Sequence, residues 1–301
     1  MMTPQMILGY QETTQVMGVT ATLTVHALDA PRLVRVGQDL LSRYEQLWSR
    51  FLPHSDITRL NNACGKTIDV DIETTDLIAT MIAAHNETGG LFNPTLLPLQ
   101  HQHGDSRSLT SVAVCSIPGT AHSWESLDGI MFNSPTSVSL PRDMTLDAGG
   151  IAKGFAADRV AQSLMQLGAT SVSVNVGGDV RIMNSDESTH DWNFDVCDTQ
   201  GITSWSTVSL RQGAIATSSM NARHRDNIGP TQHLFSRYDT VSEVATCSVI
   251  TVNATWAEIW TKLLFFSNDL HNDIQKRDLA ALIVDTDGNV YFSDKWKEYT
   301  L

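Results

Sequence analysis

One short stretch, residues 146–155, combines a carboxylate, two adjacent glycines and a lysine where a helix is predicted to begin. Paired glycines allow the backbone to turn tightly and to approach a ligand closely. The free N–H groups and the dipole of a helix N-terminus attract anions, and Lys153 adds a positive charge beside them. We therefore expect this stretch to bind phosphate, although glycine-driven helix contacts explain the same residues equally well when they are taken alone.

The stretch differs from two common nucleotide-binding motifs. A P-loop requires a glycine immediately before its lysine and a Ser or Thr immediately after it, whereas Ala152 and Gly154 flank Lys153. No strand pattern is followed by the Gly-x-Gly-x-x-Gly sequence of a Rossmann fold. Neither motif therefore describes this chain.

Apolar residues recur at helical spacing after the glycines, and Gly168 provides a stop signal. They are Ile151, Ala152, Phe155, Ala156, Val160, Leu164 and Leu167. The spacing predicts a helix over residues 151–167, with Lys153 in its first turn.

Other patterns predict the elements around this helix. Alternating apolar residues predict strands near 19–26, 172–176, 192–196, 208–210, 249–252 and 279–284. Helical spacing predicts helices over 29–51, 75–87 and 255–266. Because strands and helices do not alternate regularly, we predict an α+β fold with a compact mixed sheet and helix architecture. At 301 residues, the chain is expected to form a single domain over 1–301, or two intertwined lobes.

The composition excludes several classes of partner. The net charge is −13 and the basic residues are scattered, which argues against nucleic acid. No signal peptide and no run of eighteen apolar residues is present, so we expect a cytoplasmic protein without membrane insertion. The four cysteines are far apart, which predicts reduced thiols rather than a zinc knuckle or a disulfide framework.

Six motifs occur in one order along the chain. They are residues 16–19, 51–57 with Leu60 and Asn61, 92–95, 147–158, 177–179 and 216–218. Together they resemble the FAD:protein FMN transferases of the ApbE family, from about residue 17 to about residue 285. The resemblance implies the ApbE flavin-transferase fold. It also implies that the chain cleaves FAD, attaches FMN to a Ser or Thr of an acceptor flavoprotein and releases AMP, with Mg²⁺ present.

The resemblance also implies roles for individual residues. The positions that contact FAD in the family are occupied by Met17, Phe51, Phe92, Asn93, Asp147, Lys153, His233 and Leu234. The group expected to act at the pyrophosphate is Asp147, Lys153 and Glu258, and the carbonyl of Gly150 matches a metal ligand. Without the resemblance, the side chains of Met17, Phe51 and Phe92 would be interpreted as core.

One helix departs from the family pattern. Members carry an Asp and, four residues later, a Thr as magnesium ligands, whereas this chain has Glu258 and Lys262. An ammonium group cannot coordinate a metal. Three interpretations remain open. Glu258 and Lys262 form an ordinary i,i+4 pair and the metal site is lost. Alternatively, Thr261 supplies the missing hydroxyl ligand, or the Lys262 ammonium stands where Mg²⁺ would bind.

The departure also leaves a second class of function open. A non-catalytic FAD-binding or regulatory paralogue would keep the fold and the phosphate-binding stretch but would have a degraded magnesium site. Retained FAD binding without turnover would distinguish such a paralogue from a transferase.

Overall fold

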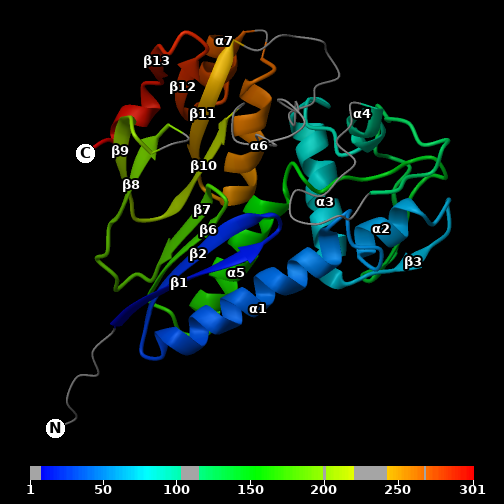
Figure 1. Cartoon of the computed structure of the whole chain (residues 1–301), viewed down its shortest axis with the longest axis horizontal. Helices are drawn as coiled ribbons and strands as arrows, with labels where there is room; N and C mark the ends of the chain where they lie inside the picture. Colours follow the sequence, from blue (N-terminus) through cyan, green and yellow to red (C-terminus); the bar gives the residue numbers. More distant parts are fainter. Residues whose placement is uncertain (1–7, 103–114, 199–200, 220–242, 268) are drawn as a thin grey trace. The chain divides into compact units, whose positions relative to one another are not determined.

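The computed structural model describes residues 8–102, 115–198, 201–219, 243–267 and 269–301 (Figure 1). The described residues form two compact units, within each of which the residues contact mainly one another. The first unit holds the described residues of 1–42, 153–222 and 242–301, and the second holds those of 43–152.

An eight-stranded sheet forms the centre of the first unit, and every neighbouring pair of strands in it is antiparallel. In spatial order the strands are β1 (Leu8–Val16), β2 (Val19–Ala27), β6 (Ser171–Val176), β7 (Asp179–Asn184), β10 (Gly213–Ser219), β11 (Val244–Thr251), β12 (Ala280–Asp285) and β13 (Val290–Phe292). The α+β fold class is thereby confirmed.

Helices cover one face of this sheet (Figure 1). They are α1 (Ala30–Trp48), which runs on into the second unit, α5 (Ala152–Gln166) and α6 (Ala254–Leu264), and the short α7 (Leu270–Lys276) follows α6. A side chain at Gly37 of α1 would collide with Leu23 of β2 and approach Val160 of α5. The missing side chain therefore lets α1 lie close to both the sheet and α5.

Over β7, β10, β11 and β12, the other face of the sheet is apolar and packs against a hairpin of β8 (Trp192–Cys197) and β9 (Ser204–Leu210), together with the 3₁₀ turn η1 (Lys295–Glu298). Trp296 of η1 is fully buried there. Because side chains alternate along a strand, Val180 and Ile182 of β7 join this apolar core, whereas Asp179 and Arg181 face the helices. This alternation explains how acidic and basic side chains come to lie beneath α5 and α6.

In its described residues, the second unit contains three helices and a small antiparallel sheet. The helices are α2 (Asp56–Asn61), α3 (Ile72–Glu87) and α4 (Leu97–Gln102), and the sheet has the order β3 (Ile68–Asp69), β5 (Ser137–Ser139), β4 (Met131–Ser134). Asp71 caps α3 by accepting a hydrogen bond from the Glu73 amide, so the helix begins three residues earlier than predicted. Leu77, Ile78 and Met81 of α3 are fully buried.

The predicted elements are present, with some shifts in their bounds. On α1, Val34 and Leu41 are fully buried, whereas Val36 and Leu40 of the predicted inner face are half-buried. Leu167 lies beyond the end of α5 and is 48% exposed, and Val252 lies outside β11 and is 78% exposed. These differences are local, because each residue lies just beyond the end of its element or at the edge of its buried face.

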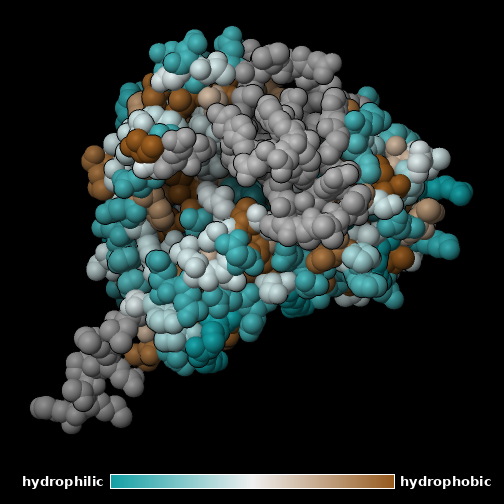
Figure 2. Space-filling model, in the orientation of Figure 1, coloured by the Kyte–Doolittle hydropathy of each residue, from teal (hydrophilic) through white to brown (hydrophobic). Residues whose placement is uncertain are grey.

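Polar residues cover most of the described surface on the face shown in Figure 2, and apolar residues there occur singly or in small groups. Within the described parts of the chain, every helix is too short or too polar to cross a bilayer.

The first turn of α5 touches the N-terminus of α6 backbone to backbone. A β-carbon placed on Gly154 would collide with the carbonyl oxygen of Ala254. It would also lie 2.6 Å from the Ala254 carbonyl carbon and 2.9 Å from the Thr255 nitrogen. Backbone atoms cannot move aside as the end of a side chain can. Glycine at this position therefore permits the close approach of the two helices.

We predict that Gly154→Ala destabilises the protein by about 3 kcal/mol, because overpacking against backbone outweighs the gain of about 1 kcal/mol from alanine's better helix propensity. The urea midpoint of unfolding measures the effect. The matched control is Gly119→Ala, because an added β-carbon there would meet open space and that glycine has no positive φ. Equal midpoints for the two variants would contradict the contact.

Candidate active site

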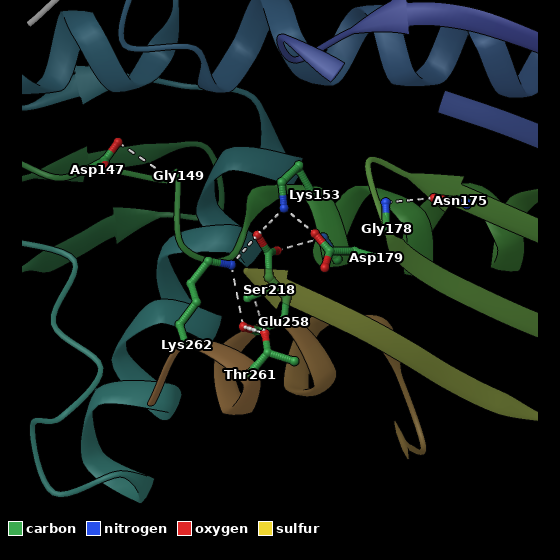
Figure 3. A network of polar contacts seen from close by, with 11 residues as sticks. Asp147, Gly149, Lys153, Asn175, Gly178, Asp179, Ser218, Glu258, Thr261 and Lys262 are labelled. Carbon is green, nitrogen blue, oxygen red and sulfur yellow. Dashed lines mark hydrogen bonds and ion pairs between the residues drawn. The ribbon is translucent and has the colours of Figure 1, made fainter. Parts of the chain in front are cut away.

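Four charged side chains converge beneath the start of α5 in the first unit (Figure 3). Lys153 Nζ donates to a carboxylate oxygen of Asp179 and to Glu258 Oε1, the latter at 2.6 Å. Lys262 Nζ donates to the same Glu258 oxygen at 2.7 Å. The second oxygen of Glu258 accepts the backbone N–H of Gly154 at 2.8 Å. We call these four side chains, from Lys153, Asp179, Glu258 and Lys262, the lysine–carboxylate cluster.

A tight turn places Asp179 in the cluster. Gly177 and Gly178 connect β6 to β7 with φ values of 64° and 96°, which only glycine adopts readily at two successive positions. The Asn175 side chain accepts the Gly178 N–H at 2.9 Å and fixes the turn. Asp179 follows as the first residue of β7 and faces the helices, where Lys153 meets it.

Glu258 is positioned by the way α6 begins. Asn253 caps the helix by accepting the Trp256 N–H at 2.9 Å. Asp158 of α5 accepts the N–H groups of Ala254 and Thr255, each at 2.9 Å, so the start of α6 is tied to α5. One turn further along α6, Glu258 then reaches the first turn of α5 and pairs with an N–H that has no partner within that helix.

Burial gives this cluster its electrostatic character. The side chains of Glu258 and Asp179 are 0% and 2% exposed, whereas those of Lys153 and Lys262 are 16% and 22% exposed. Burial alone would raise the pKa of Glu258, but the two ammonium groups outweigh burial and bring that pKa to about 2. Burial raises the pKa of Asp179 to about 6 despite the opposing charge of Lys153.

The two lysines respond differently to the same surroundings. Burial would lower the pKa of Lys153, but Asp179 and Glu258 outweigh it and hold that pKa above its ordinary value. Burial lowers the pKa of Lys262, and the positive charge of Lys153 adds to this while Glu258 opposes it. Lys153 is therefore the more firmly held cation of the two.

Two hydroxyl groups complete this region of α6. Thr261 Oγ1 lies 2.9 Å from the Glu258 carbonyl oxygen, to which it donates, and 2.9 Å from Ser218 Oγ on β10. Ser218 stands on the helix-facing side of β10 because Ala216, two residues earlier, is paired with Asp179 across the sheet. Thr261 is thus engaged in hydrogen bonds on both sides.

The predicted magnesium ligands do not fit a magnesium ion as they are arranged here. Mg²⁺ takes six oxygen ligands in near-ideal octahedral geometry. Both carboxylate oxygens of Glu258 already accept N–H donors, and the hydroxyl of Thr261 is bonded to the Glu258 carbonyl and to Ser218. The third predicted ligand, Gly150, belongs to the second unit. Across the described ranges, no group of three or more His, Cys, Asp or Glu side chains is arranged to hold a metal.

The i,i+4 pair of Glu258 and Lys262 does form, but it is not an ordinary surface pair. Glu258 is fully buried and is shared with Lys153. The hydroxyl of Thr261 is hydrogen-bonded to the Glu258 carbonyl and to Ser218, so as arranged here it points at those groups. In the structure, the ammonium of Lys262 contacts the Glu258 carboxylate directly.

In the second unit, Asp147 pairs with a residue that the sequence did not indicate. Its carboxylate lies 3.1 Å from the guanidinium of Arg50 and accepts the Gly149 N–H at 3.2 Å. The Asp147 backbone N–H donates to the Pro94 carbonyl at 2.8 Å. Arg50 also lies over the ring of Phe51, 4.9 Å from its centroid. Asp147 and Phe51 therefore share one arginine.

The segment after α3 holds two more of the predicted FAD contacts. Asn93 is used internally, because its amide N–H₂ donates to the Trp124 carbonyl at 2.8 Å and its oxygen accepts from the backbone and hydroxyl of Thr95. Phe92 is 8% exposed, and its ring edge would lie 3.4 Å from a β-carbon on Gly150. A glycine at position 150 therefore leaves room beside the aromatic ring.

The remaining predicted contacts fall elsewhere. Met17 occupies the turn between β1 and β2, where its φ of 52° is unusual for a residue with a side chain. His233 and Leu234 lie outside the described residues. The structure thus brings Lys153 and Glu258 together in the first unit, and it places Phe51, Phe92, Asn93, Asp147 and Gly150 in the second.

Comparison with known proteins agrees with this fold. The model of the ApbE family matches residues 17–291. An FAD:protein FMN transferase from Klebsiella pneumoniae (strain 342) is 26% identical over 270 residues, which covers 85% of this chain and 82% of that protein. The crystal structure of the ApbE protein from Thermotoga maritima superposes with a TM-score of 0.81 at 22% identity, covering 98% of this chain and 100% of that one. The apo flavinyl transferase ApbE from Pseudomonas stutzeri gives 0.78 at 18% identity, with both chains fully covered.

We predict strong energetic coupling between Lys153 and Asp179. Lys153→Met leaves a buried carboxylate without its cation and should destabilise the protein by about 3–5 kcal/mol. Adding Asp179→Asn removes that uncompensated charge. The double variant should therefore lose about 1–3 kcal/mol less stability than the two single variants lose in sum. Urea unfolding of the four proteins in this double-mutant cycle measures the coupling.

The exposed ion pair of Lys295 and Asp278 provides the matched control cycle. We expect little coupling there, since exposed pairs contribute little to stability. Additive effects of Lys153→Met and Asp179→Asn would contradict the proposed arrangement of the cluster.

Proposed function

The chain belongs to the ApbE family, and we propose from this that it is an FAD:protein FMN transferase, as its relative from Klebsiella pneumoniae is named. Its substrates are FAD and an acceptor flavoprotein with a Ser or Thr at the attachment site. The single observation that supports this activity most directly is the lysine–carboxylate cluster, which holds two ammonium groups at the head of a helix.

The proposed reaction breaks the phosphoanhydride bond of FAD and forms a phosphate ester to the acceptor hydroxyl. The oxygen of the acceptor hydroxyl forms a bond to the phosphorus on the riboflavin side of the FAD pyrophosphate. The bond from that phosphorus to the bridging oxygen breaks, and AMP leaves with the bridging oxygen. The hydroxyl proton is released. Such a transfer is promoted chiefly by positioning and by charge stabilisation.

The cluster suits this chemistry because each lysine is fixed in place by a buried carboxylate. The FAD pyrophosphate carries two negative charges, and Lys153 and Lys262 offer two positive ones. Glu258 contacts both lysines and Asp179 contacts Lys153, so neither ammonium has to be ordered when the substrate arrives. Glu258 and Asp179 therefore act as positioning residues in this proposal.

Further FAD contacts are proposed in each unit taken by itself. In the first unit, this is Met17. His233 and Leu234, which lie outside the described residues, are proposed from the resemblance alone. In the second unit, they are Phe51, Phe92, Asn93 and Asp147. Aromatic side chains stack on flavin and adenine rings, which suits Phe51 and Phe92. We also propose that the protein is cytoplasmic and that residues 1–301 function together as a single domain.

Three measurements on the purified full-length chain test the function. They are AMP release, covalent flavin on the acceptor and binding of FAD by quenching of flavin fluorescence. The acceptor is a domain with a Ser or Thr at a flavin attachment site, and the control is the same domain with Ala there. We expect AMP only with the hydroxyl-bearing acceptor, in equal amount to the attached FMN. FAD binding without AMP would instead indicate a non-catalytic FAD-binding paralogue.

Lys153→Met tests the role of the cluster in binding. We expect its FAD affinity to fall about 100-fold, because a charge-assisted contact with the pyrophosphate is lost. Lys297→Met is the control, since Lys297 is 67% exposed and pairs only with Asp294 among the contacts of the described residues. Unchanged binding by Lys153→Met would overturn the assignment.

A further inference from the structure

The ammonium of Lys262 lies against two oxygens of Glu258. Its nitrogen lies 2.7 Å from Glu258 Oε1 and 3.4 Å from the Glu258 carbonyl oxygen. These carboxylate and carbonyl oxygens are of the type that hard cations bind. The Lys262 ammonium therefore already interacts with the oxygens of Glu258 that a bound metal ion would use as ligands.

The charges of the described residues around Glu258 disfavour a further cation there. Lys153 and Lys262 donate to the same Glu258 oxygen, so their nitrogens are no farther apart than two hydrogen bonds laid end to end. Asp179 and Glu258 supply the two negative charges that balance the two lysines. A divalent ion on Glu258 would stand beside two ammonium groups and would be repelled by both.

The pattern of exposure shows which groups an incoming ligand meets. Glu258 is 0% exposed, while Lys153 and Lys262 keep 16% and 22% of their side chains accessible. Each ammonium has three N–H donors. Those of Lys153 are shared between Asp179 and Glu258, and those of Lys262 make one short bond, to Glu258. An anion that approaches the cluster therefore meets ammonium groups rather than carboxylates.

We propose that Lys262 supplies the positive charge that a metal ion would otherwise bring to a pyrophosphate, so that this chain binds and cleaves FAD without a divalent cation. This inference rests on the proposed flavin transfer, but it makes a separate statement about the source of charge. The lysine cannot coordinate phosphate oxygens as a metal does. It acts instead by hydrogen bonding and by charge at a fixed place.

The test compares FAD binding and AMP release by the full-length chain in excess EDTA and in Mg²⁺. The dissociation constant for FAD comes from quenching of flavin fluorescence, which does not depend on turnover. We expect the dissociation constant and the rate of AMP release each to agree within about twofold between the two buffers. Binding or AMP release that is at least tenfold weaker in EDTA and is restored by Mg²⁺ would overturn the inference while leaving flavin transfer intact.

Three variants locate the effect on Lys262. In EDTA, Lys262→Met should weaken FAD binding at least about tenfold, and Lys262→Arg should recover much of the loss because it retains the charge. Lys297→Met should bind as the unchanged chain does, since that lysine is on the exposed surface. Circular dichroism and thermal unfolding establish that each variant is folded. Unchanged metal-free binding by folded Lys262→Met would overturn the assignment.

The outcomes separate this inference from the proposed function. Metal-independent FAD binding without AMP in either buffer would support the role of Lys262 in binding, and would contradict both flavin transfer and the cleavage part of this inference. Absence of FAD binding in both buffers would contradict both proposals.

Discussion

Glu258 carries a negative charge in a position without solvent contact, and that charge has to be compensated by the protein itself. Lys153 and Lys262 meet one of its oxygens, and the Gly154 N–H meets the other. Removing any of these donors leaves a buried carboxylate under-satisfied, which costs several kcal/mol in typical proteins. The arrangement of the first unit around α5 and α6 follows from this requirement.

Several backbone features serve that one contact. Gly154 has no side chain, so α6 can come close enough for Glu258 to reach the first turn of α5. Asp158 fixes the other end of the approach by binding the first N–H groups of α6. The alternation of β7 turns Asp179 toward the helices while its neighbour Val180 joins the opposite core. The close helix contact, the helix cap and the strand alternation thus all help to position the carboxylates that hold Lys153 and Lys262.

The sequence was most informative where a contact is local. The apolar spacing after the glycines predicted α5 with Lys153 in its first turn, and the i,i+4 spacing predicted that Glu258 could meet Lys262. The partner Asp179 was not predicted, because it lies 26 residues from Lys153 and on a strand, where the helical spacing around Lys153 gives no information. The pairing of Arg50 with Asp147 also had no local signal, since the two belong to segments far apart in the chain.

A crystal structure of the chain grown with FAD and Mn²⁺ tests the source of positive charge most directly, because manganese is located by its anomalous scattering. Our account predicts no manganese peak within coordination distance of Glu258, and it predicts the Nζ atoms of Lys153 and Lys262 in hydrogen-bonding contact with the pyrophosphate oxygens. A manganese ion ligated by Glu258, with Lys262 displaced from that carboxylate, would contradict it.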